Sequence, residues 1–144
     1  MRAARNLGLD VKKSSRHEDI HDHIDYWLAF NEKGKWGVDV KGNKLPDAIC
    51  VEMKNVGGNP GWLHGGAKII AFDMPEEHGF SVVDRLELRE WVDQNVELEV
   101  VQDKKDAYRK LYTRKDRQDV ITKVILQDIR SLESYRVWKY FLDY

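Results

Sequence analysis

The chain has 144 residues, of which 42% are hydrophobic and 34% are charged, and its formal net charge is −1. That length and apolar content suit a single domain, residues 1–144, with its own hydrophobic core. The single cysteine, Cys50, excludes an intramolecular disulfide and is typical of a reducing cytoplasm. No apolar run approaches the length of a membrane span, so we expect a cytoplasmic protein without a membrane partner.

Two short helices are predicted near the start of the chain. The first covers residues 2–8 and ends near Gly8. The second begins after Ser15, the predicted N-cap, and Glu18 stands at the spacing of a capping box. This helix contains the motif His17-Glu18-x-x-His21, in which two histidines bind zinc and the glutamate is the general base of a metallopeptidase. Its polar flanks favour the alternative of a solvated helix end.

Residues 25–30 and 36–41 are predicted to form a β-hairpin. Both runs are rich in aromatic and β-branched residues, and the segment between them contains the turn-forming Gly34. Side chains alternate between the two faces of a strand, so we expect Val38 and Val40 to point into the core.

The opposite face of this hairpin carries the main candidate site. Asp39 and Lys41 would lie side by side, and antiparallel pairing would bring Asp25 close to Asp39. Paired carboxylates form a hard-oxygen site for Mg²⁺ or Mn²⁺, and a neighbouring lysine can hold a water molecule and lower its pKa. We predict Asp25, Asp39 and the Val40 carbonyl as metal ligands, and Lys41 as the residue that positions the water.

A second acid-x-Lys triplet leaves an alternative open. Residues 49–54 are predicted to form a third strand, with Glu52 and Lys54 on one face. In the favoured interpretation Glu52 lies on the strand beside the hairpin and is a fourth site residue. In the alternative, Asp39 is the leading aspartate and Glu52 and Lys54 are the catalytic pair. A structural interpretation, an ion pair on a solvated face, stays open for both residues.

An aspartate followed by Asp-x-Lys on a hairpin resembles the PD-(D/E)XK nuclease superfamily, which includes restriction enzymes, Holliday-junction resolvases and phage nucleases. The resemblance rests on Asp25 and on Asp39-Val40-Lys41, and it covers about residues 17–85. It implies an α/β fold with a central mixed β-sheet flanked by helices, and Mg²⁺-dependent hydrolysis of DNA. It also implies an acid on the preceding helix, for which Glu18 is a candidate, with Asp22 as a second choice.

A glycine-rich loop extends the resemblance. Residues 55–66 contain five glycines and one proline, which excludes regular structure, and they include Trp62. A strand with Glu52, a Gly-Trp loop and a strand ending in Phe72 are similar to small phage-type members of the superfamily. Those members usually carry an acidic residue where this chain has Lys68. Trp62 is interpreted either as a ring that stacks on a base or as an anchor in the core.

The second half of the chain supplies a candidate DNA contact. Residues 104–117 hold seven basic residues interleaved with two tyrosines, and Lys110, Arg114 and Arg117 are the predicted phosphate contacts. A solvated charged face is the alternative. The other expected elements are strands at 80–84 and 120–126, a helix at 85–92, and a helix from Leu132 to Tyr144 that packs Val137, Trp138 and Phe141 on the sheet.

These observations predict a Mg²⁺-dependent or Mn²⁺-dependent DNA endonuclease of the PD-(D/E)XK type. One alternative is a non-catalytic nucleic-acid-binding module with the same fold, and a zinc metallopeptidase is another. A nuclease that cuts both strands of a duplex needs two active sites, so a homodimer is an expected form of the enzyme.

Overall fold

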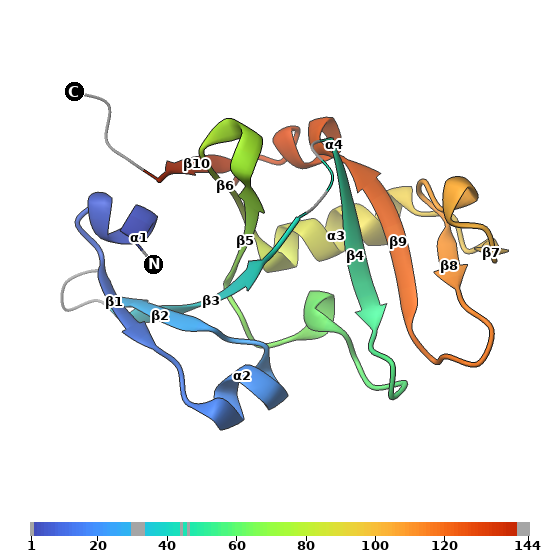
Figure 1. Ribbon diagram of the computed structural model, residues 1–144, viewed down its shortest axis with the longest axis horizontal. Coiled ribbons are helices and arrows are strands. Elements are labelled where there is room, and N and C mark those ends of the chain that lie inside the picture. The colour runs from blue at the N-terminus through green and yellow to red at the C-terminus, as the bar shows by residue number, and fades with distance from the viewer. Residues whose placement is uncertain (1, 30–33, 44, 46, 141–144) are drawn as a thin grey trace.

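The computed structural model describes residues 2–29, 34–43, 45 and 47–140. Their strands form two mixed β-sheets (Figure 1). Sheet A contains, in spatial order, β1 (Asp10–Lys13), β2 (Tyr26–Ala29), β3 (Lys35–Lys41), β5 (Ile69–Met74), β6 (Gly79–Asp84) and β10 (Arg136–Lys139). Sheet B contains β4 (Ala48–Lys54), β9 (Val120–Ile125), β8 (Leu111–Thr113) and β7 (Val100–Val101).

The helices are short. They are α1 (Arg2–Asn6), α2 (Arg16–Asp22), α3 (Arg85–Asn95) and α4 (Leu126–Arg130), and 3₁₀ turns occur at η2 (Trp62–His64), η3 (Pro75–Glu77) and η4 (Lys104–Asp106). No helix of the described residues is long and apolar enough to cross a membrane.

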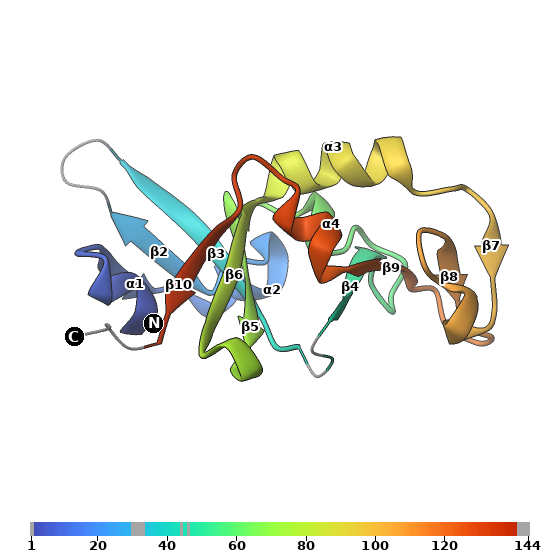
Figure 2. The same ribbon diagram turned by 90° about the horizontal axis from the view of Figure 1, so that it is seen from above.

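The α/β class and the mixed pairing agree with the prediction, but the single central sheet flanked by helices is wrong. In sheet A, β3 and β5 are parallel and the other neighbours are antiparallel, and the sheet curls into a half-barrel. The chain leaves β3 at Lys41, and β4 then pairs with β9 rather than with sheet A. Sheet B therefore occupies one side of sheet A together with α3 (Figure 2). We had expected Glu52, on β4, to lie on a strand adjacent to the hairpin. That expectation is wrong.

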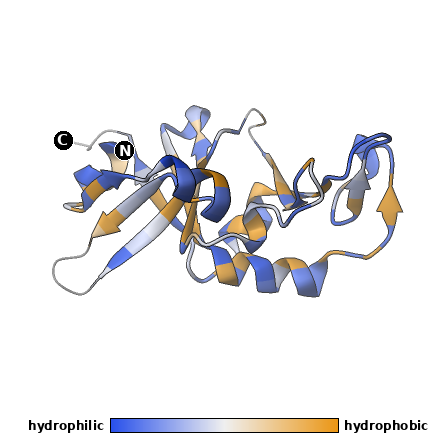
Figure 3. Cartoon of the chain, turned by 90° about the horizontal axis from the view of Figure 1, so that it is seen from below, coloured by the Kyte–Doolittle hydropathy of each residue, from blue (hydrophilic) through white to orange (hydrophobic). Residues whose placement is uncertain are grey.

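One hydrophobic cluster joins the two sheets. It includes Phe72 of β5, Val83 of β6, Val51 of β4, Val124 of β9 and Leu88 of α3, each at most 1% exposed. Hydrophilic and hydrophobic residues alternate along α3, as expected of a helix with one buried face (Figure 3). The shared cluster holds β4 next to the C-terminal end of β3, where the candidate site lies.

A second cluster covers the other face of sheet A. The small side chains of Ala3 and Ala4 let α1 pack against Leu28, Val38 and neighbouring strand residues. The expected helix at 2–8 is present and ends before Gly8, whose φ of 79° is a conformation that glycine adopts readily.

The C-terminal helix predicted from Leu132 is wrong. Residues 136–139 form β10, which pairs with β6, and Trp138 is buried while Val137 is 40% exposed. This alternation of buried and exposed side chains belongs to a strand. Phe141 lies outside the described residues. The strand β1 at Asp10–Lys13 was not expected, because its residues are almost all polar.

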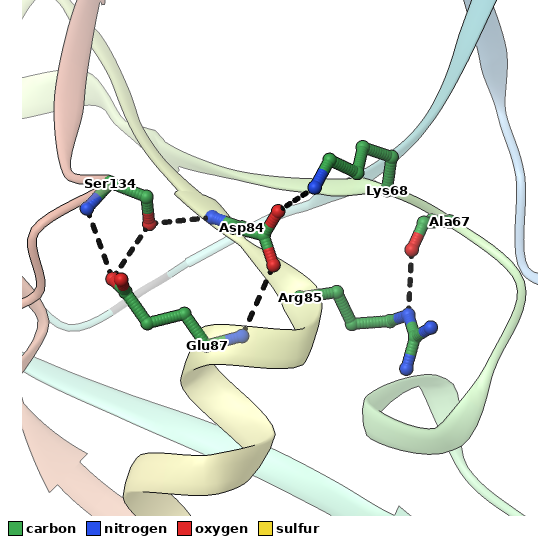
Figure 4. Close-up of polar contacts among 6 residues, drawn as sticks. All are labelled: Ala67, Lys68, Asp84, Arg85, Glu87 and Ser134. Carbon is green, nitrogen blue, oxygen red and sulfur yellow. Dashed lines mark hydrogen bonds and ion pairs between the residues drawn. The ribbon is translucent and has the colours of Figure 1, made fainter.

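A polar network joins α3 to the turn before β10 (Figure 4). Asp84 is the N-cap of α3: its Oδ1 accepts a hydrogen bond from the backbone N–H of Glu87 at 3.1 Å, and its other oxygen pairs with Lys68. The backbone N–H and hydroxyl of Ser134 both donate to Glu87 Oε1, at 3.0 and 2.8 Å. Lys68, where the resembled proteins usually have an acid, is thus part of the cap of α3.

Arg85 connects the same helix to the glycine-rich loop. Its Nε donates to the carbonyl of Ala67 at 2.6 Å and one of its terminal nitrogens donates to the carbonyl of Leu63 at 3.0 Å. These two bonds, of which Figure 4 shows the one to Ala67, hold the loop that carries Trp62 against the start of α3.

We expect Asp84→Ala to lower the free energy of unfolding by about 1–2 kcal/mol, because it removes the N-cap acceptor of α3 together with the partner of Lys68. Urea denaturation followed by circular dichroism measures this loss. Glu90→Ala is the matched control, since Glu90 is exposed on the same helix, and it should change stability by less than about 0.5 kcal/mol. Equal stability of the two variants would contradict the role of Asp84.

Candidate functional site

The hairpin of β2 and β3 places two aspartates together. Tyr26 pairs with Val38, and the backbone N–H of Asp25 donates to the carbonyl of Val38 at 2.8 Å. Continuing this antiparallel register by one residue places Asp25 opposite Asp39. The predicted pairing of the hairpin is confirmed, apart from residues 30–33 of its turn, which lie outside the described residues.

Hydrogen bonds and an ion pair orient the side chains of the site. Asp25 Oδ2 accepts a hydrogen bond from the backbone N–H of Val40 at 2.7 Å. Lys41 Nζ lies 3.2 Å from Asp39 Oδ1. Asp39 is only 3% exposed, whereas the side chain of Lys41 is 29% exposed. The structure thus brings Asp25, Asp39 and Lys41 together, with a buried carboxylate at the centre and an amine that reaches solvent.

Asp39 is an unusual carboxyl group. Burial raises its pKa from 3.8 to about 7; the charge and hydrogen bond of Lys41 oppose the rise, and Asp25 adds to it. Its Oδ2 atom is buried and has no hydrogen-bond partner among the described residues. A buried oxygen without a donor is costly, and such atoms concentrate at functional sites. This oxygen is available to a cation.

A third aspartate, Asp19 of α2, faces the same pair. Its pKa is raised, first by its contact with the carboxyl of Asp25 and then by partial burial. The sequence suggested Glu18 for this position, or Asp22 as second choice, and the structure corrects this. Glu18 accepts hydrogen bonds from the Ser15 N–H and from Trp27 Nε1, both at 2.9 Å.

The capping box that was predicted from the sequence bears on which acid of α2 lies beside Asp25. A glutamate in that box turns back toward the N-cap, and the predicted box of Ser15 and Glu18 is present. The next residue points about 100° further around the helix at 3.6 residues per turn. The predicted capping box could therefore have argued against Glu18 as the additional acid beside Asp25.

Glu52 lines a neighbouring pocket instead of the aspartate cluster. This pocket has a volume of about 300 Å³, and Lys41, Cys50, Glu52 and Trp62 are among its lining residues. Glu52 comes from sheet B and Lys41 from sheet A, so the pocket lies between the sheets. Among the described residues, Lys54 has no carboxylate within ion-pair distance, and the expected ion pair between Glu52 and Lys54 is not formed.

Trp62 is an anchor in the core and not an exposed stacking ring. It is 5% exposed and packs edge-on against Phe72, with 5.8 Å between the ring centroids. Lys41 Nζ lies 5.5 Å from the centre of its ring. The neighbouring Gly61 allows the close approach of this loop, because a Cβ there would lie 2.6 Å from the carbonyl oxygen of Glu52. The ring of Trp62 thus packs against the amine of Lys41. Because the ring is buried, the predicted stacking of Trp62 on a DNA base is not available in this conformation.

The three cations predicted to bind DNA are not equivalent. Lys110 pairs with Glu99 at 2.8 Å, and Arg114 pairs with the buried Asp119. Arg117 is exposed and has no ion pair with any described residue. Two of the three side chains therefore have structural partners, and of the three only Arg117 has no ion pair with a described residue.

The zinc motif lacks the surroundings of a metallopeptidase site. His17 and His21 share a face of α2, with 4.3 Å between their ring centroids, but no residue of α2 is buried. Glu18 is occupied by the cap and by Trp27, so it is not placed as a general base. Within the described parts of the chain, no three His, Cys, Asp or Glu side chains form a group that could hold a metal ion.

The hairpin site nevertheless has the donor chemistry that Mg²⁺ requires. Mg²⁺ keeps several water ligands and is commonly bound by one or two carboxylates together with substrate oxygens. Asp25 and Asp39 supply two carboxylates, and the unpartnered Oδ2 of Asp39 is the atom whose burial is otherwise unexplained. This donor set fits a hard divalent cation, and it contains no sulfur or imidazole ligand typical of zinc.

Comparison with known proteins found no matching family model, no similar curated protein and no similar solved structure.

We expect Asp39→Asn to melt roughly 5–10 °C above the wild-type protein at pH 8 and close to it at pH 4, a difference that follows from the raised pKa. A carboxyl whose pKa is 3.8 in the unfolded chain and about 7 in the folded protein stabilises the fold below pH 3.8 and loses that contribution as the pH rises to 7. Asparagine has no charge to bury. Melting curves over this pH range, without divalent cations, measure the difference.

Glu90→Gln is the matched control because it removes one exposed carboxylate. Its melting temperature should follow that of the wild-type protein at every pH. A constant difference between Asp39→Asn and the wild-type protein from pH 4 to pH 8 would show that Asp39 does not titrate in this way.

Proposed function

We propose that the chain is a Mg²⁺-dependent DNA endonuclease of the PD-(D/E)XK type, whose site consists of Asp25, Asp39 and Lys41. The observation that carries this proposal is the buried Asp39, whose one oxygen lies 3.2 Å from Lys41 Nζ and whose other oxygen has no partner among the described residues. A carboxylate and a lysine held together in this way are suited to a metal-assisted phosphodiester hydrolysis.

In this proposal each side chain has a separate task. Asp25 and Asp39, with the backbone carbonyl of Val40, would hold the cation. The hydrogen bond from the Val40 N–H keeps the Asp25 carboxylate in a fixed orientation before any ligand binds. Mg²⁺ bound there would supply positive charge that stabilises the negative charge developing on the phosphate.

Lys41 would hold the attacking water. Its amine is anchored by Asp39 and stacks over the ring of Trp62, and it still reaches solvent. A fixed positive charge lowers the pKa of a water molecule beside it, so the hydroxide form becomes accessible at neutral pH. Asp19 would help to hold the outer ligands of the cation through its contact with Asp25.

The geometry favours Asp39 and Lys41 over Glu52 and Lys54 as the catalytic pair. Lys54 is exposed on sheet B, and its strand has a β-bulge between Glu52 and Lys54 that breaks the alternation of the strand. Glu52 reaches the pocket beside Lys41 and is proposed as a residue that contacts substrate or water there.

We expect Lys41→Ala to retain Mg²⁺ binding and to lose DNA cleavage by roughly 10²–10³-fold, because the carboxylates remain while the group that orients the water is gone. Asp25→Asn and Asp39→Asn should each lose both Mg²⁺ binding and DNA cleavage. Calorimetry with Mg²⁺ measures binding, and cleavage of labelled single-stranded, duplex and branched DNA measures turnover.

Lys54→Ala is the matched control and should cleave like the wild-type protein. An inactive Lys54→Ala with an active Lys41→Ala would move the catalytic pair to Glu52 and Lys54. DNA binding by the wild-type protein without cleavage of any of the three substrates would instead favour the non-catalytic module. A homodimer remains a prediction for an enzyme that cuts both strands of a duplex.

A further inference from the structure

A second cavity lies beside the candidate site on the same side of the hairpin. It has a volume of about 630 Å³ and is lined by residues 10–15 with Glu18, Trp27, Ala29 and Lys35. It therefore involves β1, β2, β3 and the start of α2, which lie together in the fold (Figure 1). Pockets of this size hold small ligands or single nucleotides.

Strand register shows that the cavity and the aspartates share one face of sheet A. Lys12 pairs with Trp27, and Trp27 pairs with Gly37. Residues two apart along a strand point the same way, so Trp27 shares a face with Asp25, and Lys35 shares a face with Asp39. Four residues of extended strand separate Lys35 from Asp39 by roughly 13 Å, so one DNA strand could contact both.

The charges in this cavity favour an anionic ligand. Lys12 has no carboxylate partner among the described residues, and Lys35 Nζ lies over the ring of Trp27, 4.5 Å from its centre. The acidic Glu18 is satisfied by the hydrogen bonds from Ser15 and Trp27. The charged lining residues are the three lysines Lys12, Lys13 and Lys35 and the two carboxylates of Asp10 and Glu18, so positive charge exceeds negative charge by one.

The cavity also contains an unused hydrogen-bonding group. The Oγ atom of Ser14 is buried and has no partner in the described part of the chain. The Ser14 N–H donates to the carbonyl of Asp25 at 3.0 Å, which ties this residue directly to the strand that carries the candidate site. A phosphate oxygen would give the Ser14 hydroxyl an acceptor.

We propose that this cavity is a DNA-backbone subsite, which binds phosphates of the substrate strand roughly 13 Å from the bond that is cut. Lys12 and Lys35 contact the phosphates, and Ser14 donates a hydrogen bond to one of them. This inference rests on the proposed function and deepens it, because it gives the direction in which the substrate leaves the site: along β2 and β3, past Trp27.

The test measures DNA binding in EDTA, so that cleavage does not enter. The probes are a fluorescein-labelled 20-nucleotide single strand and the matching duplex, titrated by anisotropy at several salt concentrations. Removal of two phosphate contacts in Lys12→Ala/Lys35→Ala should reduce the salt slope by about 0.7 per contact for the single strand and about 0.9 for the duplex. Ser14→Ala should weaken binding with an unchanged slope, since it removes no charge.

Arg136→Ala/Lys139→Ala is the matched control. It also removes two exposed cations without ion pairs among the described residues, both from β10 at the far edge of sheet A. Its slope and affinity should equal those of the wild-type protein. Equal losses in the two double variants would show that only net charge matters and would overturn the subsite.

Lysine acetylation read by mass spectrometry gives a second readout on the wild-type protein. Bound DNA should protect Lys12 and Lys35 and leave Lys139 reactive. Cleavage of DNA by a protein whose Lys12 and Lys35 stay reactive would overturn the subsite and leave the nuclease proposal standing. Protection of both lysines in a protein that cleaves no DNA would support the subsite and overturn the nuclease. Absence of binding to either probe overturns the subsite.

Discussion

The antiparallel pairing of β2 with β3 is the contact on which the candidate site depends. It pairs Tyr26 with Val38 and so brings Asp25 beside Asp39; the Asp25 N–H donates to the Val38 carbonyl, and the Val40 N–H donates to the Asp25 carboxylate. Side chains alternate between the two faces of β3, so Val38 points into the core and Asp39 points toward Asp25. A shift of one residue in this pairing would exchange the two faces and disperse the site.

This arrangement carries a cost in stability at neutral pH. Asp39 is buried beside another carboxyl group, and the one nearby cation, Lys41, compensates only in part, so the pKa remains near 7. The hydrophobic cluster that joins both sheets offsets the cost of burying Asp39. In this cluster, Phe72 and Trp62 pack next to Lys41. In the proposed function, a divalent cation bound to this carboxylate would offset the penalty.

The two halves of the fold contribute differently. Sheet A and α2 supply the three aspartates and Lys41, while sheet B supplies Glu52 and closes the pocket beside Lys41. The cap of α3 by Asp84 and the bonds of Arg85 to the Trp62 loop hold the halves in register. The cleft between the sheets is thus a product of packing, and the approach of Asp25 to Asp39 is a product of one hairpin.

The sequence by itself determined the local features: the hairpin, the capping box of Ser15 and Glu18, and the convergence of Asp25, Asp39 and Lys41, all of which follow from the period of a strand or the geometry of a helix end. Tertiary structure alone decided the rest. The partner of β4, the strand at Trp138 and the burial of Trp62 depend on contacts between segments far apart in the chain, and no local pattern encodes which strand edge another segment will meet.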